Sequence, residues 1–487
     1  MTNTNAHDTA ELVIVANRLP LRRSVDAEGI VSWLPSPGGL VTAIQPLIDQ
    51  FDRTAAWIGW DGTTGEEPQE PFGDGRITAV PFEMSEEEVR RFYQGSANAA
   101  LWPLYHDAIR PPLFDAESWE VYTQVNRRYA ETTAEWIAPG GVVWIHDYHF
   151  QLMPQMLRDL RPDVRIGFFL HIPFPPTELF TQLPWRTEVL RGLLGADLVG
   201  FQEPVAARNF GVLTRRFGLA TGAMPLLSSG GRRVRVGTYP ASIDVDWFAR
   251  ISADPSTAVA AGDVRVQLGS PQRVLLGVDR LDYTKGIDAR LEAFRAFVVE
   301  HKLRPSDVTM VQVAVPSRED VGAYETERQK IEQLVGEING DHGEVGAPLV
   351  HYLYRSVDQR ELIALYRAAD VMLVTPFRDG MNLVAKEYVA SRVDNDGVLV
   401  LSEFAAASRE LQAALQVNPH DRPGMVEAIS KAVWMPERER RQRMRRMRRS
   451  VGAWTAQDWA EAFLSDLAAQ GEGQRTIDGH QRGRDPS

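Results

Sequence analysis

Residues 371–387, VMLVTPFRDGMNLVAKE, place a buried strand directly before a helix. The apolar run Val371–Thr375 is continuous rather than alternating, which is typical of a strand buried on both faces of a parallel sheet. Pro376 ends this strand, Gly380 permits an unusual backbone turn, and a helix is predicted to begin near Asn382. A strand that leads at once into a helix is the repeating unit of an α/β fold.

The same alternation of short apolar runs and longer amphipathic stretches continues along the rest of the chain. The other predicted strands are Leu12–Ala16, Ala55–Trp60, Val142–His146, Arg165–His171, Leu198–Phe201, Val234–Tyr239, Val274–Asp279, Val308–Val315, Leu349–Leu353 and Val398–Leu401. The clearest helices are Ser118–Ile137, Pro204–Phe217, Arg290–Glu300, Arg318–Ile338, Asp358–Ala368 and Leu383–Arg392. Each half holds too many strands for one small sheet, so the sequence predicts two doubly wound domains divided near residues 240–247.

This interpretation gives an N-terminal domain over 11–243 and a C-terminal domain over 244–452. An amphipathic helix within 453–469 is expected to pack back on the N-terminal domain. The tail 470–487 is rich in glycine and charge and is predicted to be disordered. The Arg-rich stretch Glu437–Arg449 is interpreted as a solvated helix face rather than an RNA-binding element.

Composition excludes several classes of function. The chain has no cysteine, which rules out disulfides, a thiolate nucleophile and cysteine-ligated zinc, and fits a reducing compartment. No apolar run is long enough to span a bilayer, and we expect a cytoplasmic protein without membrane contact. The net charge of −12 argues against general nucleic-acid binding. Anionic ligands would therefore need locally concentrated Arg and Lys.

The helix that begins near Asn382 is a candidate phosphate site, because its first amides carry partial positive charge. Glu387, about one turn inside this helix, could accept hydrogen bonds from ribose hydroxyls. The alternatives are structural: Asp379 could cap the helix, and Glu387 could be an ordinary surface acid.

A second candidate segment, Val278–Gly286, follows another predicted strand. Arg280 and Lys285 are two cations on a tight turn, and they could hold a diphosphate. The alternative for this segment alone is a solvated loop with incidental pairing of Asp and Arg.

In the first half, two predicted strands end in polar residues, His146 and Asp147 on one and His171 on the next. Asp147 could accept hydrogen bonds from a sugar, and His171 is either part of a site or a satisfied structural histidine. His146 and His149 lack a third ligand at a suitable spacing, so no metal is expected.

The remaining signals are weaker when taken alone. Arg18 places a cation after the first strand, and residues 37–40 offer a glycine turn, but neither a GxGxxG nor a Walker motif occurs. Tyr93, Trp102 and Arg318 could equally be packing aromatics and a surface cation. The missing fingerprint disfavours a nicotinamide-dependent oxidoreductase.

Taken in order, these motifs resemble the trehalose-6-phosphate synthases, a family of retaining glycosyltransferases of GT-B architecture, over about residues 11–468. The motifs that carry the resemblance are Asn17-Arg18, residues 36–40 (SPGGL), 144–149 (WIHDYH), 171–175 (HIPFP), 280–286 (RLDYTKG) and 378–387 (RDGMNLVAKE).

The resemblance implies two Rossmann-like domains that face a central cleft, and an enzyme that transfers glucose from a nucleotide-glucose to glucose 6-phosphate with no cofactor. UDP-glucose is the family default, with ADP-glucose and GDP-glucose left open. The implied donor-binding residues are Gly39, Arg280, Lys285, Asp379, Met381, Asn382, Leu383, Val384 and Glu387. The implied acceptor-binding residues are Arg18, Tyr93, Trp102, Asp147 and Arg318. Those expected nearest the reaction are Asp147, His171, Arg280, Lys285 and Asp379.

Two features depart from the family pattern. The loop Pro20–Trp33 is longer than in the shortest members, so the form of a lid over the site is left undecided by the resemblance. No phosphatase domain follows, so a separate phosphatase is expected downstream, and a homo-oligomer is possible. The alternatives that stay open are a sister transferase with glycerol phosphate or a cyclitol phosphate as acceptor, and a non-catalytic subunit that binds sugar phosphate.

Overall fold

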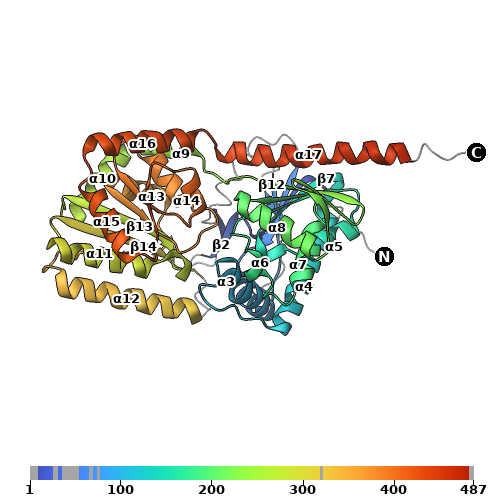
Figure 1. Cartoon of the computed structure of the whole chain (residues 1–487), viewed down its shortest axis with the longest axis horizontal. Coiled ribbons are helices and arrows are strands. Elements are labelled where there is room, and N and C mark those ends of the chain that lie inside the picture. Colours follow the sequence, from blue (N-terminus) through green and yellow to red (C-terminus); the bar gives the residue numbers. More distant parts are fainter. Residues whose placement is uncertain are drawn as a thin grey trace, which may run out of the picture. The chain divides into compact units, whose positions relative to one another are not determined.

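The computed structural model describes residues 9–25, 31–35, 54–64, 70–73, 77–317 and 322–481. The described residues form two units (Figure 1). Unit 1 comprises those up to Pro240 together with those from Gln457 onward, and unit 2 comprises Ala241–Ala456. Each unit is an α/β layer structure built on a sheet of mainly parallel strands, and the predicted fold class is confirmed.

The sheet of unit 2 has, within the described residues, six parallel strands in the order β15-β14-β13-β16-β17-β18. The strands are β13 (Arg273–Arg280), β14 (Val308–Val315), β15 (Val350–Leu353), β16 (Val371–Val374), β17 (Val398–Ser402) and β18 (Leu415–Val417). Numbered along the chain, this order is 3-2-1-4-5-6, the arrangement of dinucleotide-binding folds.

Helices cover both faces of this sheet. One face is packed by α11 (Ile287–His301), α12 (Gly322–His342) and α15 (Arg422–Val433). The other is packed by α9 (Val245–Ala253), α13 (Gln359–Ala368), α14 (Leu383–Ser391) and α16 (Glu437–Gly452), with α10 (Pro255–Gln267) beside α13. Because side chains alternate along a strand, Leu275 faces the first layer while Val274 and Leu276 face the second, which explains the continuous apolar runs.

The larger sheet, in unit 1, has the order β10-β11-β12-β9-β8-β7-β1-β4-β6-β5. Its strands are β1 (Ala10–Arg18), β4 (Ala55–Trp60), β5 (Phe72–Gly73), β6 (Ile77–Pro81), β7 (Ile137–His146), β8 (Arg165–Leu170), β9 (Leu198–Phe201), β10 (Thr221–Ala223), β11 (Leu226–Ser229) and β12 (Arg232–Thr238). The central strands β12, β9, β8, β7, β1, β4 and β6 are parallel, while β5 at one edge and β10 and β11 at the other pair antiparallel.

The main helices of unit 1 are α4 (Ala116–Trp136), α5 (Met153–Leu160), α7 (Arg186–Leu194), α8 (Pro204–Arg216) and α17 (Ala456–Gln481), with the π-helix η1 (Val89–Leu101) before α4. Shorter ones are α2 (Glu86–Glu88), α3 (Trp102–Tyr105) and α6 (Thr177–Phe180). Side-chain N-caps define where several helices begin in both units. In α4, for example, Asp115 accepts a hydrogen bond from the amide of Ser118 at 2.8 Å.

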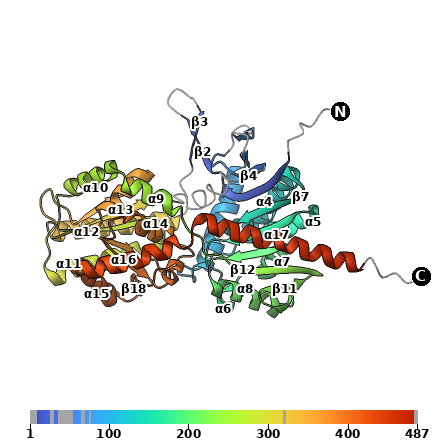
Figure 2. The same cartoon turned by 90° about the horizontal axis from the view of Figure 1, so that it is seen from above.

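The last helix, α17, lies beside β12 in both views (Figures 1 and 2). Phe463 fills a slot made by two glycines, since a Cβ atom on Gly167 or Gly200 would lie 2.6 Å from its ring. Asp466 accepts hydrogen bonds from Arg235 at 3.0 Å and from the Tyr239 hydroxyl at 2.6 Å. The helix is thereby fixed to β8, β9 and β12 of unit 1.

Two segments differ from the sequence-based expectation. Residues 20–33, interpreted as a loop, include β2 (Leu21–Val25) and part of β3 (Val31–Pro35), which pair antiparallel. Helix α17 runs on through Gln481, where a disordered tail was expected from residue 470. A helix that is already nucleated extends at little cost through Gln, Glu and Arg, which explains the difference. None of the helices in the described part of the chain is long and apolar enough to cross a membrane.

Candidate active site

The two motifs of unit 2 meet at the point where its strand order reverses. Strands β13 and β16 are neighbours, and the chain continues from β13 toward β14 on one side and from β16 toward β17 on the other. Connections that leave in opposite directions open a crevice at the carboxyl ends of the two strands, where ligands of doubly wound folds bind. Arg280 ends β13, and Thr375 follows β16.

A charged pair joins the two motifs. The Nζ atom of Lys285 donates to Oδ2 of Asp379 at 2.6 Å, and both residues are buried. The same Oδ2 accepts from Nδ2 of Asn382 at 3.0 Å, while Oδ1 accepts from the amide of Met381 at 3.2 Å. Asp379 thus organises the turn before α14 and orients Lys285, a larger role than the helix cap considered from sequence.

The cap of α14 is Asn382 itself. Its backbone has φ 61°, in the left-handed region that Asn tolerates better than most residues. Its side chain accepts a hydrogen bond from the amide of Ala385 at 3.2 Å. Leu383 is buried and Val384 half-buried in the first turn, and Met381 is half-buried just before it. The structure therefore confirms the predicted helix start and brings these residues together.

Glu387 lies one turn further along α14 and is half-buried. The hydroxyl of Tyr366 on α13 donates to its Oε2 atom at 2.8 Å. Burial raises the pKa of Glu387 to about 6, while the hydrogen bond from Tyr366 opposes that rise. A carboxylate held in this way is not the freely solvated surface acid that was the alternative interpretation.

Behind the turn 280–286 lies a residue that sequence reasoning missed. The fully buried guanidinium of Arg290 on α11 pairs with Asp279 and donates to Gln312 Oε1 at 3.0 Å and to Thr375 Oγ1 at 3.0 Å. It also donates to the carbonyl of Lys285 at 3.4 Å. Arg290 therefore connects β13, β14 and the residue after β16 with the turn.

The turn is braced a second time by Asp282. Its Oδ1 atom accepts from the amide and the hydroxyl of Thr284 at 2.9 and 2.8 Å, and its Oδ2 accepts from Tyr324 on α12 at 3.2 Å. Residues 281–287 are buried, and only Arg280 is exposed at the end of β13. The alternative of a solvated loop is therefore wrong.

Unit 1 repeats the same layout at the ends of β1 and β7. Asp147 directly follows β7 and has φ 75°, a conformation that is strained for a residue with a Cβ. Its amide donates to the carbonyl of Phe169 at 2.8 Å, and its Oδ1 accepts from the amide of His171 at 3.2 Å. The two predicted residues Asp147 and His171 are thus in direct contact.

His171 also contacts His146 from the preceding strand. The Nε2 atom of His171 lies 3.0 Å from Nδ1 of His146, and both side chains are buried. Burial lowers the pKa of His171 to about 3 and also lowers that of His146, so both imidazoles are neutral near neutral pH.

Arg18, at the end of β1, is exposed and lies over two aromatic rings. Its guanidinium carbon is 3.9 Å from the centroid of Trp60 and 5.9 Å from that of Tyr93. Gly62 has φ 102°, and a Cβ there would lie 2.3 Å from Nη1 of Arg18. Tyr93 in turn stacks on His149 with centroids 6.0 Å apart. Trp60 and Gly62 position Arg18 and were not identified from the sequence.

Other predicted residues are placed differently or lie outside the described residues. Trp102 is only 3 % exposed and packs against Tyr148 with ring centroids 5.7 Å apart. It therefore supports the wall of the site from behind. Gly39 and Arg318 fall outside the described residues.

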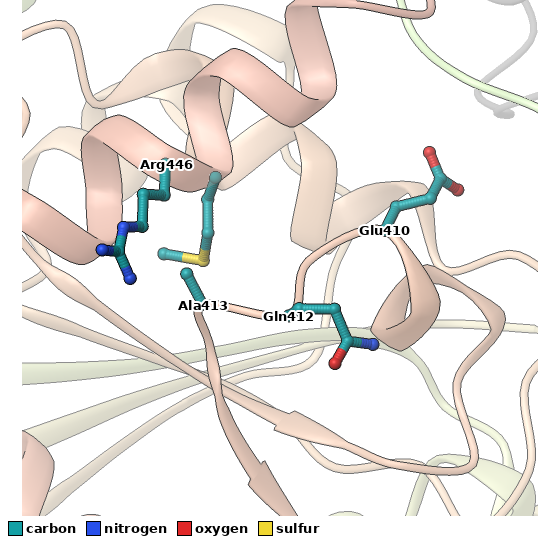
Figure 3. A pocket seen from close by; sticks show the side chains of 5 residues that line it. Glu410, Gln412, Ala413 and Arg446 are labelled. Atoms are coloured by element: carbon teal, nitrogen blue, oxygen red, sulfur yellow. The ribbon is translucent and has the colours of Figure 1, made fainter.

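Two surface hollows lie apart from these residues. One is lined in unit 2 by Glu410, Gln412, Ala413, Arg446 and Met447 (Figure 3). Figure 3 shows Glu410 and Arg446 on opposite sides of this hollow. The carboxylate of Glu410 accepts a hydrogen bond from the buried Nζ atom of Lys386 at 2.8 Å. The same Nζ atom donates to the carbonyl of Ala241 at 2.8 Å.

A family model described as Glycosyltransferase family 20 matches residues 10–469, which include the motifs of both units. The chain belongs to glycosyltransferase family 20.

Curated relatives of this chain include the trehalose-6-phosphate synthases of Mycobacterium marinum and Mycolicibacterium smegmatis. The first is 49% identical over 478 residues, covering 96% of this chain and 95% of the relative. The second is 50% identical over 473 residues, covering 95% and 93%. The family recognised from the sequence motifs is confirmed, and the chain is an enzyme of the glycosyltransferase class.

Two solved structures share the fold of this chain. An alpha,alpha-trehalose-phosphate synthase (UDP-forming) from Burkholderia xenovorans, in complex with glucose-6-phosphate, has a TM-score of 0.86 and 33% identity, covering 94% of this chain and 99% of that chain. A structure from E. coli, bound with UDP-2-fluoro glucose, has a TM-score of 0.85 and 35% identity, covering 94% and 98%.

Proposed function

We propose that this chain is an α,α-trehalose-phosphate synthase. It transfers glucose from a nucleotide-glucose to glucose 6-phosphate with retention at the anomeric carbon, and it releases a nucleoside diphosphate. The observation that carries the proposal is the Lys285–Asp379 pair, which lies at the strand-order reversal of unit 2 in a chain of family 20. Asp379 fixes the ammonium group of Lys285 at the place where a doubly wound fold binds its ligand. The buried Arg290 braces the turn that carries Lys285.

Unit 2 supplies most of the contacts with the nucleotide-glucose in this proposal. Arg280 and Lys285 hold the diphosphate, the first as a planar fork and the second as a point charge. The start of α14, with Asn382, Leu383 and Val384, adds hydrogen-bond donors to the same group. The further donor contacts are assigned to Asp379 and Met381 for the glucose, Glu387 for the ribose and Gly39 for the diphosphate.

Unit 1 supplies most of the proposed contacts with glucose 6-phosphate. Arg18 and Arg318 hold its phosphate, and Tyr93 and Asp147 position its hydroxyls. Trp102 acts through Tyr148, against which it packs. His171 contacts the donor glucose close to the reacting carbon.

The reaction forms a bond between the anomeric carbon and the acceptor oxygen while the bond from that carbon to the diphosphate oxygen breaks. We infer a front-face substitution, in which the departing diphosphate accepts the proton of the acceptor hydroxyl. The charge that develops on the leaving group is stabilised by Arg280, Lys285 and the start of α14. Binding of both sugars aligns the reacting atoms, which removes most of the entropic cost of the encounter.

Several finer points belong to the same proposal. UDP-glucose, ADP-glucose and GDP-glucose are the candidate donors. The absence of cysteine agrees with a cytoplasmic location, and a separate phosphatase would consume the product. A homo-oligomer is compatible with these assignments.

The test is product analysis with the full chain. Glucose 6-phosphate, glycerol phosphate or a cyclitol phosphate is incubated in turn with UDP-, ADP- or GDP-glucose, and nucleoside diphosphate release is measured together with the NMR spectrum of the sugar product. Trehalose 6-phosphate with two α-anomeric signals is expected from at least one donor. Turnover only with glycerol phosphate or a cyclitol phosphate would identify the sister transferase, and no release from any donor would identify a binding subunit.

A further inference from the structure

The histidine pair of unit 1 has an unequal environment. His146 is fully buried on β7, and its Nδ1 atom lies 3.0 Å from Nε2 of His171. Two indole rings cover it, with Trp144 at 4.6 Å and Trp459 of α17 at 6.5 Å between ring centroids. Trp459 also lies 6.0 Å from the His171 ring, so α17 forms the back wall of the pair.

The other nitrogen of His146, Nε2, is buried and has no hydrogen-bond partner among the described residues. The nitrogen atoms of the two indole rings that cover it carry N–H groups, which donate and cannot accept. A proton on Nε2 of His146 would therefore be a buried donor without an acceptor, which native structures avoid more strictly than an unpaired acceptor.

This asymmetry decides the direction of the hydrogen bond between the two histidines. A neutral imidazole carries one proton, and that of His146 is accordingly placed on Nδ1. We propose that His146 is a positioning residue, which donates from Nδ1 to Nε2 of His171 and thereby fixes His171 as the tautomer protonated at Nδ1.

The consequence for catalysis rests on the proposed function. With its Nε2 occupied as an acceptor, His171 can present only a donor, at Nδ1, to an oxygen of the donor glucose or its diphosphate. The Asp147 carboxylate accepts from the amide of His171 at 3.2 Å and restrains the backbone from the other side. A tautomer fixed before the substrate arrives needs no reorganisation during the reaction.

The direct test is NMR of the full chain with 15N-labelled histidine and no ligand, in which long-range 1H–15N correlations report each tautomer. His146→Asn and His171→Asn variants assign the signals. We expect both rings to be neutral and protonated at Nδ1 between about pH 6 and pH 8. A His171 ring protonated at Nε2 would overturn the proposal. Because this measurement needs no turnover, it is independent of whether the proposed transferase activity is found.

A second measurement separates positioning from packing. His146→Asn keeps an amide donor near the Nδ1 position, whereas His146→Leu keeps bulk and removes the donor. We expect kcat to fall about 10- to 100-fold in His146→Leu, with a KM for glucose 6-phosphate within about twofold of wild type, and to recover most of that loss in His146→Asn. The exposed control His301→Asn leaves kcat unchanged. Equal activity of the Leu and Asn variants, with wild-type melting curves, would contradict a positioning role.

Discussion

Lys285 and Asp379 lie 94 positions apart in the sequence, yet their side chains are joined at 2.6 Å. The contact connects the turn after β13 with the turn before α14, on the two strands between which the order of the unit 2 sheet reverses. Lys285 is held in place by a carboxylate that also accepts hydrogen bonds from Asn382 and from the amide of Met381. Its charge is thereby positioned before any ligand binds.

Replacing Lys285 with Met should remove this charge while keeping most of the side-chain volume. We expect kcat/KM for the nucleotide-glucose to fall about 100-fold or more, because a preorganised cation at the leaving group is lost. Nucleoside diphosphate release measures the effect, and Lys431→Met, an exposed change on α15, serves as the control. Activity within a few-fold of wild type would show that Lys285 does not contact the diphosphate.

Glu387 should make stability depend on pH in a defined direction. Its pKa in the folded chain is about 6, above the ordinary value of 4.5, so the folded state binds the proton more tightly than the unfolded state. Its contribution to the free energy of unfolding is present below about pH 4.5 and is lost as the pH rises through 6, a change of about 1–2 kcal/mol.

The variant Glu387→Gln lacks this titration. Its free energy of unfolding relative to that of wild type should rise by about 1–2 kcal/mol between about pH 4.5 and about pH 7.5, as measured by urea unfolding. Glu427→Gln, an exposed change on α15, should show no such trend. A constant difference between Glu387→Gln and wild type across this range would disprove the buried titration.

The slot for Phe463 predicts that single methyl groups disturb the docking of α17. In Gly167→Ala or Gly200→Ala, the new Cβ atom would lie 2.6 Å from the Phe463 ring, and we expect a loss of about 1–3 kcal/mol from overpacking. The control is Gly262→Ala in α10, where nothing lies within 4 Å of the added Cβ. That change should stabilise the chain by about 0.4–1 kcal/mol. Thermal unfolding distinguishes the two, and equal melting temperatures would refute the slot.

Arg290 should be needed for the stability of the fold. Arg290→Met leaves the carboxylate of Asp279 buried without its partner, so we expect a loss of about 3–5 kcal/mol. Arg295→Met on the same helix alters only partly exposed ion pairs and should change stability by less than about 0.5 kcal/mol. If both variants unfold at the same denaturant concentration, the buried network does not support the turn.

Much of the fold was predictable because its strands are buried on both faces. Nearly continuous apolar runs such as Val308–Val315 mark such strands directly, and β14 has these same bounds. The short edge strands β5, β10 and β11 could not be identified in this way, since they are partly exposed and have few apolar residues. Their pairing depends on neighbours distant in the sequence.

The candidate site was predictable where polar residues follow a buried strand, as with Asp147, His171 and Lys285. The supporting residues were not. Arg side chains are usually solvent-exposed, and the contacts of Arg290 with Asp279 on β13, Gln312 on β14 and Thr375 after β16 show that this one is buried. Trp459 lies over 280 residues from His171, so its place behind the histidine pair follows from tertiary packing alone.

The central claim is that Arg280 of unit 2 binds the nucleotide-glucose and Arg18 of unit 1 binds glucose 6-phosphate, and calorimetric titration of two variants tests it most directly. Arg18 and Arg280 are both exposed at strand ends, so their replacement with Ala should leave the fold intact. We predict that Arg280→Ala loses most of its affinity for UDP-glucose but keeps that for glucose 6-phosphate, and that Arg18→Ala shows the reverse. If both variants lost affinity for the same ligand, or neither lost any, the assignment of Arg280 to the donor and Arg18 to the acceptor would be contradicted.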